Sequence, residues 1–248
     1  MSDPQPSRRS DIPVIHLLPN LLTIIAICAG MTAIRFGYQG DFPMAVKLIL
    51  LAAVLDGLDG RLARLIRSQS PVGAELDSLA DFLNFGVAPA LLLHAWALQD
   101  FSRAGWVAVL GYAVCCVLRL ARFNVNSRLD VDKIDNRFFV GVPSPAGAVL
   151  VLLPMTLAFA LPDLPRVPPA ALSVYMLLIG ALMISHLPTW SFKNLSVSRS
   201  QSRYLLLITV LVAALLFTYL WAILVVATFL YGAGLIWSIW TLFRPRKG

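Results

Sequence analysis

Four aspartates, Asp56, Asp59, Asp77 and Asp81, lie within one short segment, 56–81, of a chain that is 58% hydrophobic. A carboxylate beside lipid hydrocarbon costs about 2.5 kcal/mol or more, and neighbouring acids also repel one another. Clustered carboxylates bind hard divalent cations such as Mg²⁺ and Mn²⁺, and two such ions can stabilise both sides of a phosphoryl transfer. The four aspartates are therefore candidate metal ligands. The alternative is a structural cluster in which nearby arginines neutralise the acids.

Helical periodicity places these aspartates on two faces that can meet. In a helix over 43–65, polar and small residues share one face. They are Asp56, Asp59, Gly60, Ala63 and Arg64, and Arg67 continues the same face just beyond this range. A second helix, beginning near Gly73, carries Asp77, Asp81 and Asn84 on a single face. A turn at 68–72 would set the two faces against each other.

Small residues beside the aspartates indicate room for a ligand. Gly60, Ala63 and Gly73 leave a cleft where a bulky molecule can approach the backbone, and Arg64 and Arg67 supply positive charge for a diphosphate. Small residues also promote ordinary helix packing in membranes, so for Ala63 alone both interpretations stay open.

The composition predicts a membrane protein. Only 13% of the 248 residues are charged and the mean hydropathy is +0.78, which excludes a soluble domain of this size and argues against a nucleic-acid partner. Apolar runs of about 20 residues are typical of membrane-spanning helices. We expect an all-α, polytopic bundle of about eight spans. They are 17–36, 43–65, 76–98, 104–123, 144–161, 168–187, 204–220 and 222–243.

The last two spans come from one apolar stretch, 204–243, which is too long for one helix across about 30 Å of hydrocarbon. We therefore predict that the chain folds back near Tyr219–Trp221. Three regions result: a cytoplasmic N-terminal arm (1–16), a membrane core (17–193), and a C-terminal hairpin with a basic tail (194–248).

The distribution of basic residues predicts the orientation. If the N-terminus is cytoplasmic, most of the 20 Lys and Arg residues fall on the inner side. Only Arg35, Lys47, Arg103 and Arg166 would lie on the outer side. We expect both termini, and the aspartates, at the cytoplasmic side.

The pattern Asp56-x2-Asp59-Gly60-x2-Ala63-Arg64-x8-Gly73-x3-Asp77-x3-Asp81 resembles the signature of the CDP-alcohol phosphotransferase family at every fixed position. Flanking segments are similar to the integral-membrane phosphatidylserine synthases within that family. These segments are LPNLLT (18–23), ELDSLADFLNFGVAPALL (75–92), RLARFNV (119–125) and FFVGVPSPAGA (138–148), with a looser match in LMISHLPTWSFK (182–193).

The resemblance implies a fold, a reaction and a site. It implies a six-helix core followed by two C-terminal helices, a homodimer, and a place in the bacterial cytoplasmic membrane with the active site facing the cytosol. The reaction would join CDP-diacylglycerol and L-serine to give phosphatidylserine and CMP. Asp56, Asp59, Asp77 and Asp81 would hold two Mg²⁺ or Mn²⁺ ions, with Asp81 also the general base. The nucleotide-binding positions would be Gly60, Ala63, Arg64 and Gly73.

The acceptor-binding residues are less closely defined by sequence. A serine carboxylate favours a guanidinium partner, and Arg119 and Arg122 can share a helix face. Anchoring at the lipid headgroups is the alternative role for both arginines. Asn84, on the aspartate face, is a third candidate for contact with the acceptor.

Other functions remain as alternatives. Glycerol 3-phosphate, an inositol phosphate or choline could replace serine in the same chemistry. Intramembrane prenyltransferases also pair aspartates with Mg²⁺, but they lack the DG-x2-AR element. A cation transporter would need acids or broken helices near the middle of the membrane, whereas these acids cluster toward one side.

Overall fold

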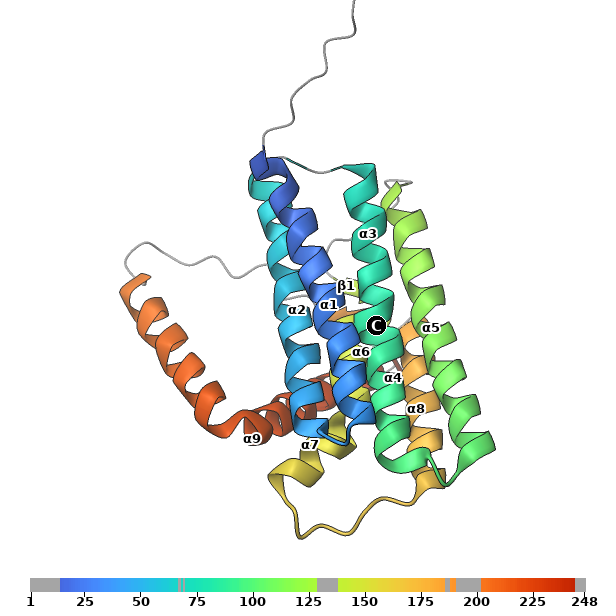
Figure 1. The fold of residues 1–248 in the computed structure, drawn as a ribbon. Coiled ribbons are helices and arrows are strands. Elements are labelled where there is room, and N and C mark those ends of the chain that lie inside the picture. Colours follow the sequence, from blue (N-terminus) through green and yellow to red (C-terminus); the bar gives the residue numbers. More distant parts are fainter. Residues whose placement is uncertain are drawn as a thin grey trace, which may run out of the picture.

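The structure is a computed structural model that describes residues 14–66, 68, 70–128, 138–185, 188–190 and 202–243. It is a bundle of long helices (Figure 1). The helices are α1 (Leu18–Tyr38), α2 (Phe42–Leu65), α3 (Pro71–Asp81), α4 (Ala88–Leu93), α5 (Ser102–Arg128), α6 (Ser144–Val151), α7 (Leu153–Ala160), α8 (Pro169–Ile184) and α9 (Ser202–Phe243). A 3₁₀ turn, Val14–Leu17, leads into α1.

Local capping fixes where the helices of the site begin. Asp41 accepts the Met44 N–H at 3.1 Å before α2, and Ser70 accepts the Gly73 N–H at 3.0 Å before α3. Each cap satisfies a backbone donor that the first helical turn leaves free. Pro71 at the first position of α3 lacks an N–H and suits that place. The turn between α2 and α3 is therefore well defined, and it carries the two aspartate-bearing helix ends toward each other.

The segment 71–98 is one continuous helix with two π-helical parts, η2 (Phe82–Val87) and η3 (His94–Leu98). A π-helix shifts the hydrogen-bonding register and commonly occurs at functional sites. The buried Tyr112 hydroxyl donates to the Phe85 carbonyl of η2 at 2.9 Å. Because η2 directly follows Asp81, this bond helps to fix the helix at the site.

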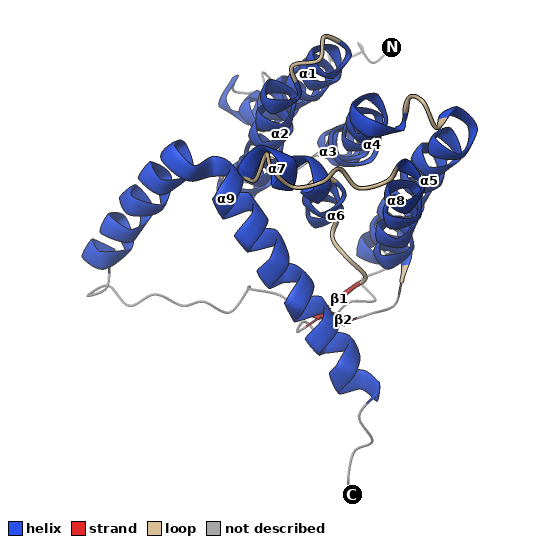
Figure 2. Ribbon diagram, turned by 90° about the horizontal axis from the view of Figure 1, so that it is seen from below, coloured by secondary structure: helices blue, strands red, loops and turns tan. Residues whose placement is uncertain are grey.

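Seen from below, α6 lies among the other core helices (Figure 2). It contacts α4, α5, α8, α9 and η2, while α1 packs along α2 and α5 packs along α8. The core is made of buried side chains such as Ile49, Leu92, Tyr112 and Met176. The helices packed around α6 thus form the all-α bundle that the sequence predicted.

Two short strands add a feature that the sequence analysis did not predict. β1 (Phe138–Val140) pairs antiparallel with β2 (Pro188–Trp190), with Phe139 opposite Thr189. Three-residue strands carry too little period-two pattern to recognise before their partner is known. The pairing joins the segment before α6 to the segment after α8.

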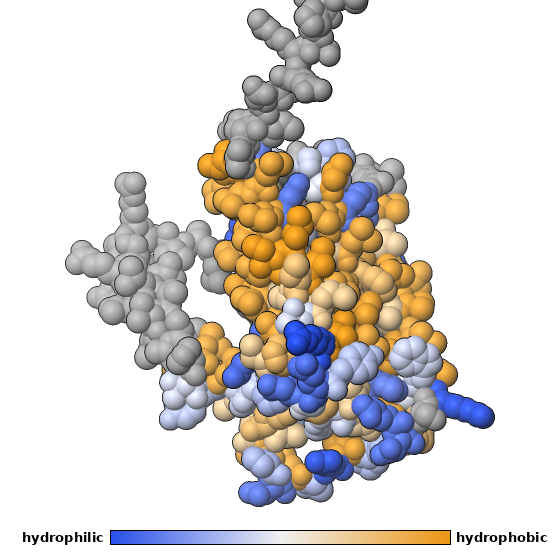
Figure 3. Space-filling view, viewed as in Figure 1, coloured by the Kyte–Doolittle hydropathy of each residue, from blue (hydrophilic) through white to orange (hydrophobic). Residues whose placement is uncertain are grey.

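Many large apolar side chains are exposed on the bundle, and on the face shown in Figure 3 they predominate over its upper and middle parts. Within the described part of the chain, four helices are long and apolar enough to cross a membrane: Ile15–Tyr38, Pro71–Leu98, Arg103–Asn126 and Thr218–Ser238. Helices also occupy the other predicted spans, but α2 carries several charges, α6 and α7 are separated at Leu152, and α8 has 16 residues. The structure therefore supports a membrane protein, and the number of spans stays a prediction.

Helix α9 breaks at Tyr219, which has non-helical angles of φ −123° and ψ 39°. The break lies where the sequence predicted it. However, the two halves diverge in Figures 1 and 2 and do not form the expected hairpin. Helix α9 instead contacts α7, α6 and β2, and Trp221, just after the break, packs edge-to-face on Phe159 of α7 with ring centroids 4.8 Å apart. Apolar packing on the bundle replaces packing between the halves.

Candidate active site

The two aspartate-bearing helix faces meet at one end of the bundle. One carboxylate oxygen from each of Asp56, Asp59 and Asp77 lies within 4.8 Å of the others. Asp81 is one helical turn beyond Asp77, and its carboxyl group lies within hydrogen-bonding reach of Asp56. The structure thus brings together all four predicted aspartates, from the end of α2 and the length of α3.

The partners of these carboxylates fit a divalent metal better than a salt-bridge cluster. Asp59 is only 3% exposed, and its Oδ2 accepts a 2.6 Å hydrogen bond from the Thr23 hydroxyl. Its Oδ1, and Oδ1 of Asp81, are buried without a hydrogen-bond partner. A buried anionic oxygen without a donor is costly unless a cation compensates for it. An all-carboxylate donor set suits Mg²⁺ or Mn²⁺.

A pocket of about 260 Å³ opens beside the aspartates, between α1, the end of α2 and the start of α3. Six of the predicted site residues line it: Asp59, Gly60, Ala63, Arg64, Gly73 and Asp77. A Cβ on Gly60 would meet no atom within 4 Å, whereas one on Gly73 would lie 2.8 Å from Asn20 Oδ1. Gly60 therefore leaves open space, and Gly73 permits a close approach of α1 to α3.

Sequence reasoning missed the contribution of α1 to this pocket. Asn20 and Thr23 line it from one side, and Ser68 and Ser70 line it from the α2–α3 turn. Asn20 and Thr23 belong to the LPNLLT segment and are three residues apart, so they share a helix face. That spacing was a usable signal, but it lies far in sequence from the aspartates.

Asn84 is fully buried within η2, and neither atom of its amide has a hydrogen-bond partner. Its Oδ1 faces Gly30 of α1, where a Cβ would clash with it. Asn84, predicted on the aspartate face as a candidate for contact with the acceptor, is thus buried against α1, and it does not line the pocket described above.

The two candidate arginines of α5 have different surroundings. Arg119 donates from Nε to the Val142 carbonyl and from Nη1 to the Ser144 hydroxyl, both at 2.7 Å, and it interacts electrostatically with Asp81. Arg122 is exposed and donates to the Ile184 carbonyl at 2.9 Å, at the end of α8. Arg119 is therefore the better placed of the two for the aspartate site. Arg67 lies outside the described residues.

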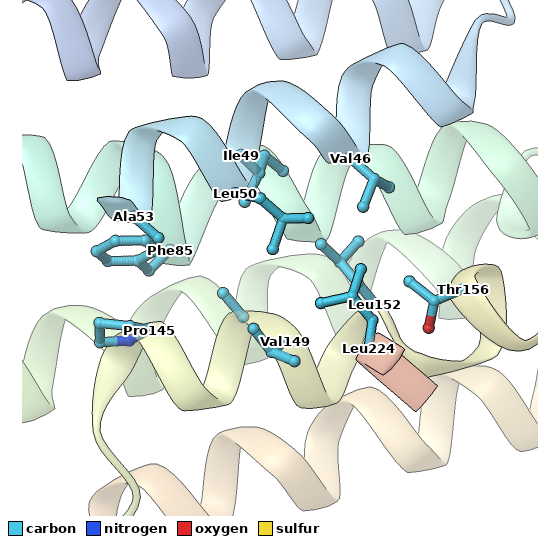
Figure 4. Close-up of a pocket in the computed structure, with 11 residues that line it drawn as sticks. Val46, Ile49, Leu50, Ala53, Phe85, Pro145, Val149, Leu152, Thr156 and Leu224 are labelled. Atoms are coloured by element: carbon cyan, nitrogen blue, oxygen red, sulfur yellow. The ribbon is translucent and has the colours of Figure 1, made fainter. Parts of the chain in front are cut away.

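A second, apolar gap separates α2 from α6 (Figure 4). Val46, Ile49, Val149 and Leu152 are among its walls, and its volume is about 20 Å³. That is room for about one water-sized sphere. This gap is a packing irregularity between helices, lined by apolar side chains and by Thr156, whose hydroxyl donates to the Leu153 carbonyl.

Comparisons with known proteins identify a family and several relatives. The sequence model of the CDP-alcohol phosphatidyltransferase family matches residues 16–240. A CDP-diacylglycerol–serine O-phosphatidyltransferase of Helicobacter pylori (strain 26695) is 37% identical over 180 residues, covering 73% of this chain and 74% of the relative.

Proteins of the same name from mycobacteria are more similar over a shorter region. The Mycobacterium leprae protein is 52% identical over 139 residues, and the Mycobacterium tuberculosis (H37Rv) protein is 51% identical over 142 residues. Each match covers 56% of this chain, and 46% and 48% of those relatives respectively. The chain thus spans about half the length of the mycobacterial relatives that it matches.

Proposed function

The chain belongs to the CDP-alcohol phosphatidyltransferase family, and we propose that it transfers the phosphatidyl group of CDP-diacylglycerol to L-serine, giving phosphatidylserine and CMP. The observation that carries this proposal is the meeting of Asp56, Asp59 and Asp77 beside a pocket lined by Gly60 and Arg64. The choice of serine rests on the names of the relatives.

The pocket is suited to the cytidine diphosphate part of the donor. Gly60, Ala63 and Gly73 allow the nucleotide to approach the backbone, and Arg64 offers donors to phosphate oxygens. The four aspartates would hold two Mg²⁺ or Mn²⁺ ions, which would neutralise charge on the diphosphate. Thr23 would orient Asp59 through their 2.6 Å hydrogen bond.

Asp81 is the residue that we assign as general base. It interacts electrostatically with both Asp56 and Arg119, and its Oδ1 is buried without a hydrogen-bond partner. The serine hydroxyl gives its proton to Asp81 as its oxygen forms a bond to the lipid-bearing phosphorus. The bond from that phosphorus to the CMP oxygen breaks, and CMP leaves. A poor nucleophile needs such a positioned base.

The membrane setting follows from the position of the site. The exposed apolar surface contacts lipid, and the aspartates lie toward one end of the bundle, the end of the α2–α3 turn (Figure 1). We propose that this end faces the cytosol, that the donor lipid approaches from the inner leaflet of the cytoplasmic membrane, and that the protein works as a homodimer.

The test is CMP release by purified protein in detergent, with CDP-diacylglycerol and Mn²⁺ or Mg²⁺. Parallel reactions contain L-serine, glycerol 3-phosphate, an inositol phosphate or choline. We expect release with serine alone, and none from the Asp81→Asn variant. Release with a different alcohol would show that this alcohol is the acceptor in place of serine, and the assignment of the aspartate site would still stand. Folded protein that releases no CMP with any acceptor would contradict the enzyme assignment and favour cation transport, which metal flux into liposomes would reveal.

A further inference from the structure

Two of the donor directions of the Arg119 guanidinium are fixed by the protein. Its Nε binds the Val142 carbonyl and its Nη1 binds the Ser144 hydroxyl. A guanidinium has five N–H groups, so donors remain for a ligand after these two bonds. The partly buried Arg119 side chain is therefore oriented in advance, which reduces the entropy lost when it binds an anion.

The loop that holds Arg119 is itself tightly seated. Gly141 has φ +80°, and a Cβ there would lie 2.6 Å from the Met183 carbonyl oxygen and 2.7 Å from that of Ser185. Only glycine fits this turn without strain. Ser144, at the start of α6, is fully buried between two prolines. The two partners of Arg119, the Val142 carbonyl and the Ser144 hydroxyl, thus lie on a segment that packs closely against the end of α8.

Tyr231 reaches the same place from α9. Its hydroxyl is buried without a hydrogen-bond partner, and its side chain is near enough to Arg119 for an electrostatic interaction. A buried phenol without a partner is unfavourable, and buried tyrosine hydroxyl groups usually have one. By contrast, Tyr112 and Tyr175 donate to the carbonyls of Phe85 and Leu150. The unpaired hydroxyl of Tyr231, within electrostatic range of the Arg119 guanidinium, fits a ligand with an acceptor oxygen.

We propose that Arg119 and Tyr231 bind the carboxylate of the acceptor amino acid, with Ser144 as the positioning residue for Arg119. The inference rests on the proposed function, since it assigns the subsite of that acceptor. Arg119 also interacts with Asp81, so a short amino acid held by its carboxylate presents its hydroxyl group toward the general base. The C-terminal helix α9 thereby completes the acceptor site of the bundle.

The experiment measures KM for L-serine and for CDP-diacylglycerol by CMP release, using wild-type protein and Tyr231→Phe. Losing one hydrogen bond to a charged group corresponds to about a tenfold loss of affinity. We expect KM for serine to rise about tenfold in Tyr231→Phe, with KM for CDP-diacylglycerol unchanged. Tyr175→Phe is the matched control, because it removes a phenol hydroxyl that binds only the Leu150 carbonyl. KM for serine should stay the same in the control.

Ser144→Ala tests the positioning role separately. It frees Nη1 of Arg119, so we expect a higher KM for serine with a smaller change in kcat, while Ser144→Thr, which keeps the hydroxyl, should restore part of the loss. An unchanged KM for serine in Tyr231→Phe, or equal rises for both substrates, would overturn the proposed subsite alone. Wild-type protein that releases no CMP with serine would overturn the proposed function and the subsite together.

Discussion

At the residue scale, Thr23 shows how a neutral side chain can tune an acidic site. Its hydroxyl lies 2.6 Å from Asp59 Oδ2 and 3.1 Å from the Pro19 carbonyl. Outer partners of metal ligands commonly change metal affinity by about 10- to 100-fold when removed. We predict that Thr23→Val raises the Mn²⁺ concentration needed for half-maximal CMP release by about tenfold. Thr23→Ser, which keeps the hydroxyl, should need nearly the same Mn²⁺ concentration as wild type. If Thr23→Val also needs the same concentration, Thr23 does not support metal binding through Asp59.

Asp81 has opposite effects on activity and on stability. A general base contributes about 10²- to 10⁴-fold to the rate, so if Asp81 has this proposed role, Asp81→Asn should lose at least about a hundredfold of CMP release. A buried carboxylate without a donor destabilises the folded protein, so the same variant should be as stable as wild type or more stable in EDTA.

Thermal unfolding in detergent measures the stability of Asp81→Asn. Asp163→Asn is the control for activity, because Asp163 lies in the exposed connection between α7 and α8. A marked loss of stability in Asp81→Asn without metal would contradict this account of the site.

At the element scale, the contact of α1 with η2 depends on a glycine. A Cβ at Gly30 would clash with the side chain of Asn84, which is fully buried in η2. Overpacking of this kind costs about 1–3 kcal/mol, so Gly30→Ala should unfold at a lower temperature than wild type. Gly232→Ala in α9 is the matched control, since its Cβ would meet no atom within 4 Å and alanine favours a helix. Equal unfolding temperatures for the two variants would contradict the predicted clash.

Some helices and contacts could be predicted from the sequence, and others could not. The helices of the core follow from apolar runs and from caps such as Asp41 and Ser70, because these signals are local. The meeting of Asp56 with Asp77 follows from helical period and a short turn. The π-helical segment η2 could not be predicted from the sequence, because its hydrogen-bonding register depends on tertiary partners such as Tyr112. The direction of α9 after Tyr219 depends likewise on packing against α7, so the expected hairpin was wrong and Tyr231 was not recognised.

At the scale of the whole molecule, charge differs between the two ends of the bundle. Arg35 in the last turn of α1, Arg103 near the start of α5 and Arg166 before α8 lie at the end of the α1–α2 turn. Arg61 and Arg64 lie at the opposite end, beside the aspartates. Basic residues favour the cytoplasmic side. Because the sequence analysis assigns most of the 20 Lys and Arg residues to the side of the aspartates, we predict that this end faces the cytosol.

Cysteine labelling tests the orientation directly. Val72, at the start of α3, is 74% exposed, and Asp163 is exposed at the other end of the bundle. In spheroplasts, a membrane-impermeant maleimide should label Asp163→Cys, and it should label Val72→Cys only after the membrane is opened. The native Cys28, Cys115 and Cys116 lie within the apolar helices α1 and α5, and unsubstituted protein measures their background. Labelling of Val72→Cys in intact spheroplasts would reverse the proposed orientation, and it would place the pocket beside the aspartates on the side of the membrane away from cytosolic serine.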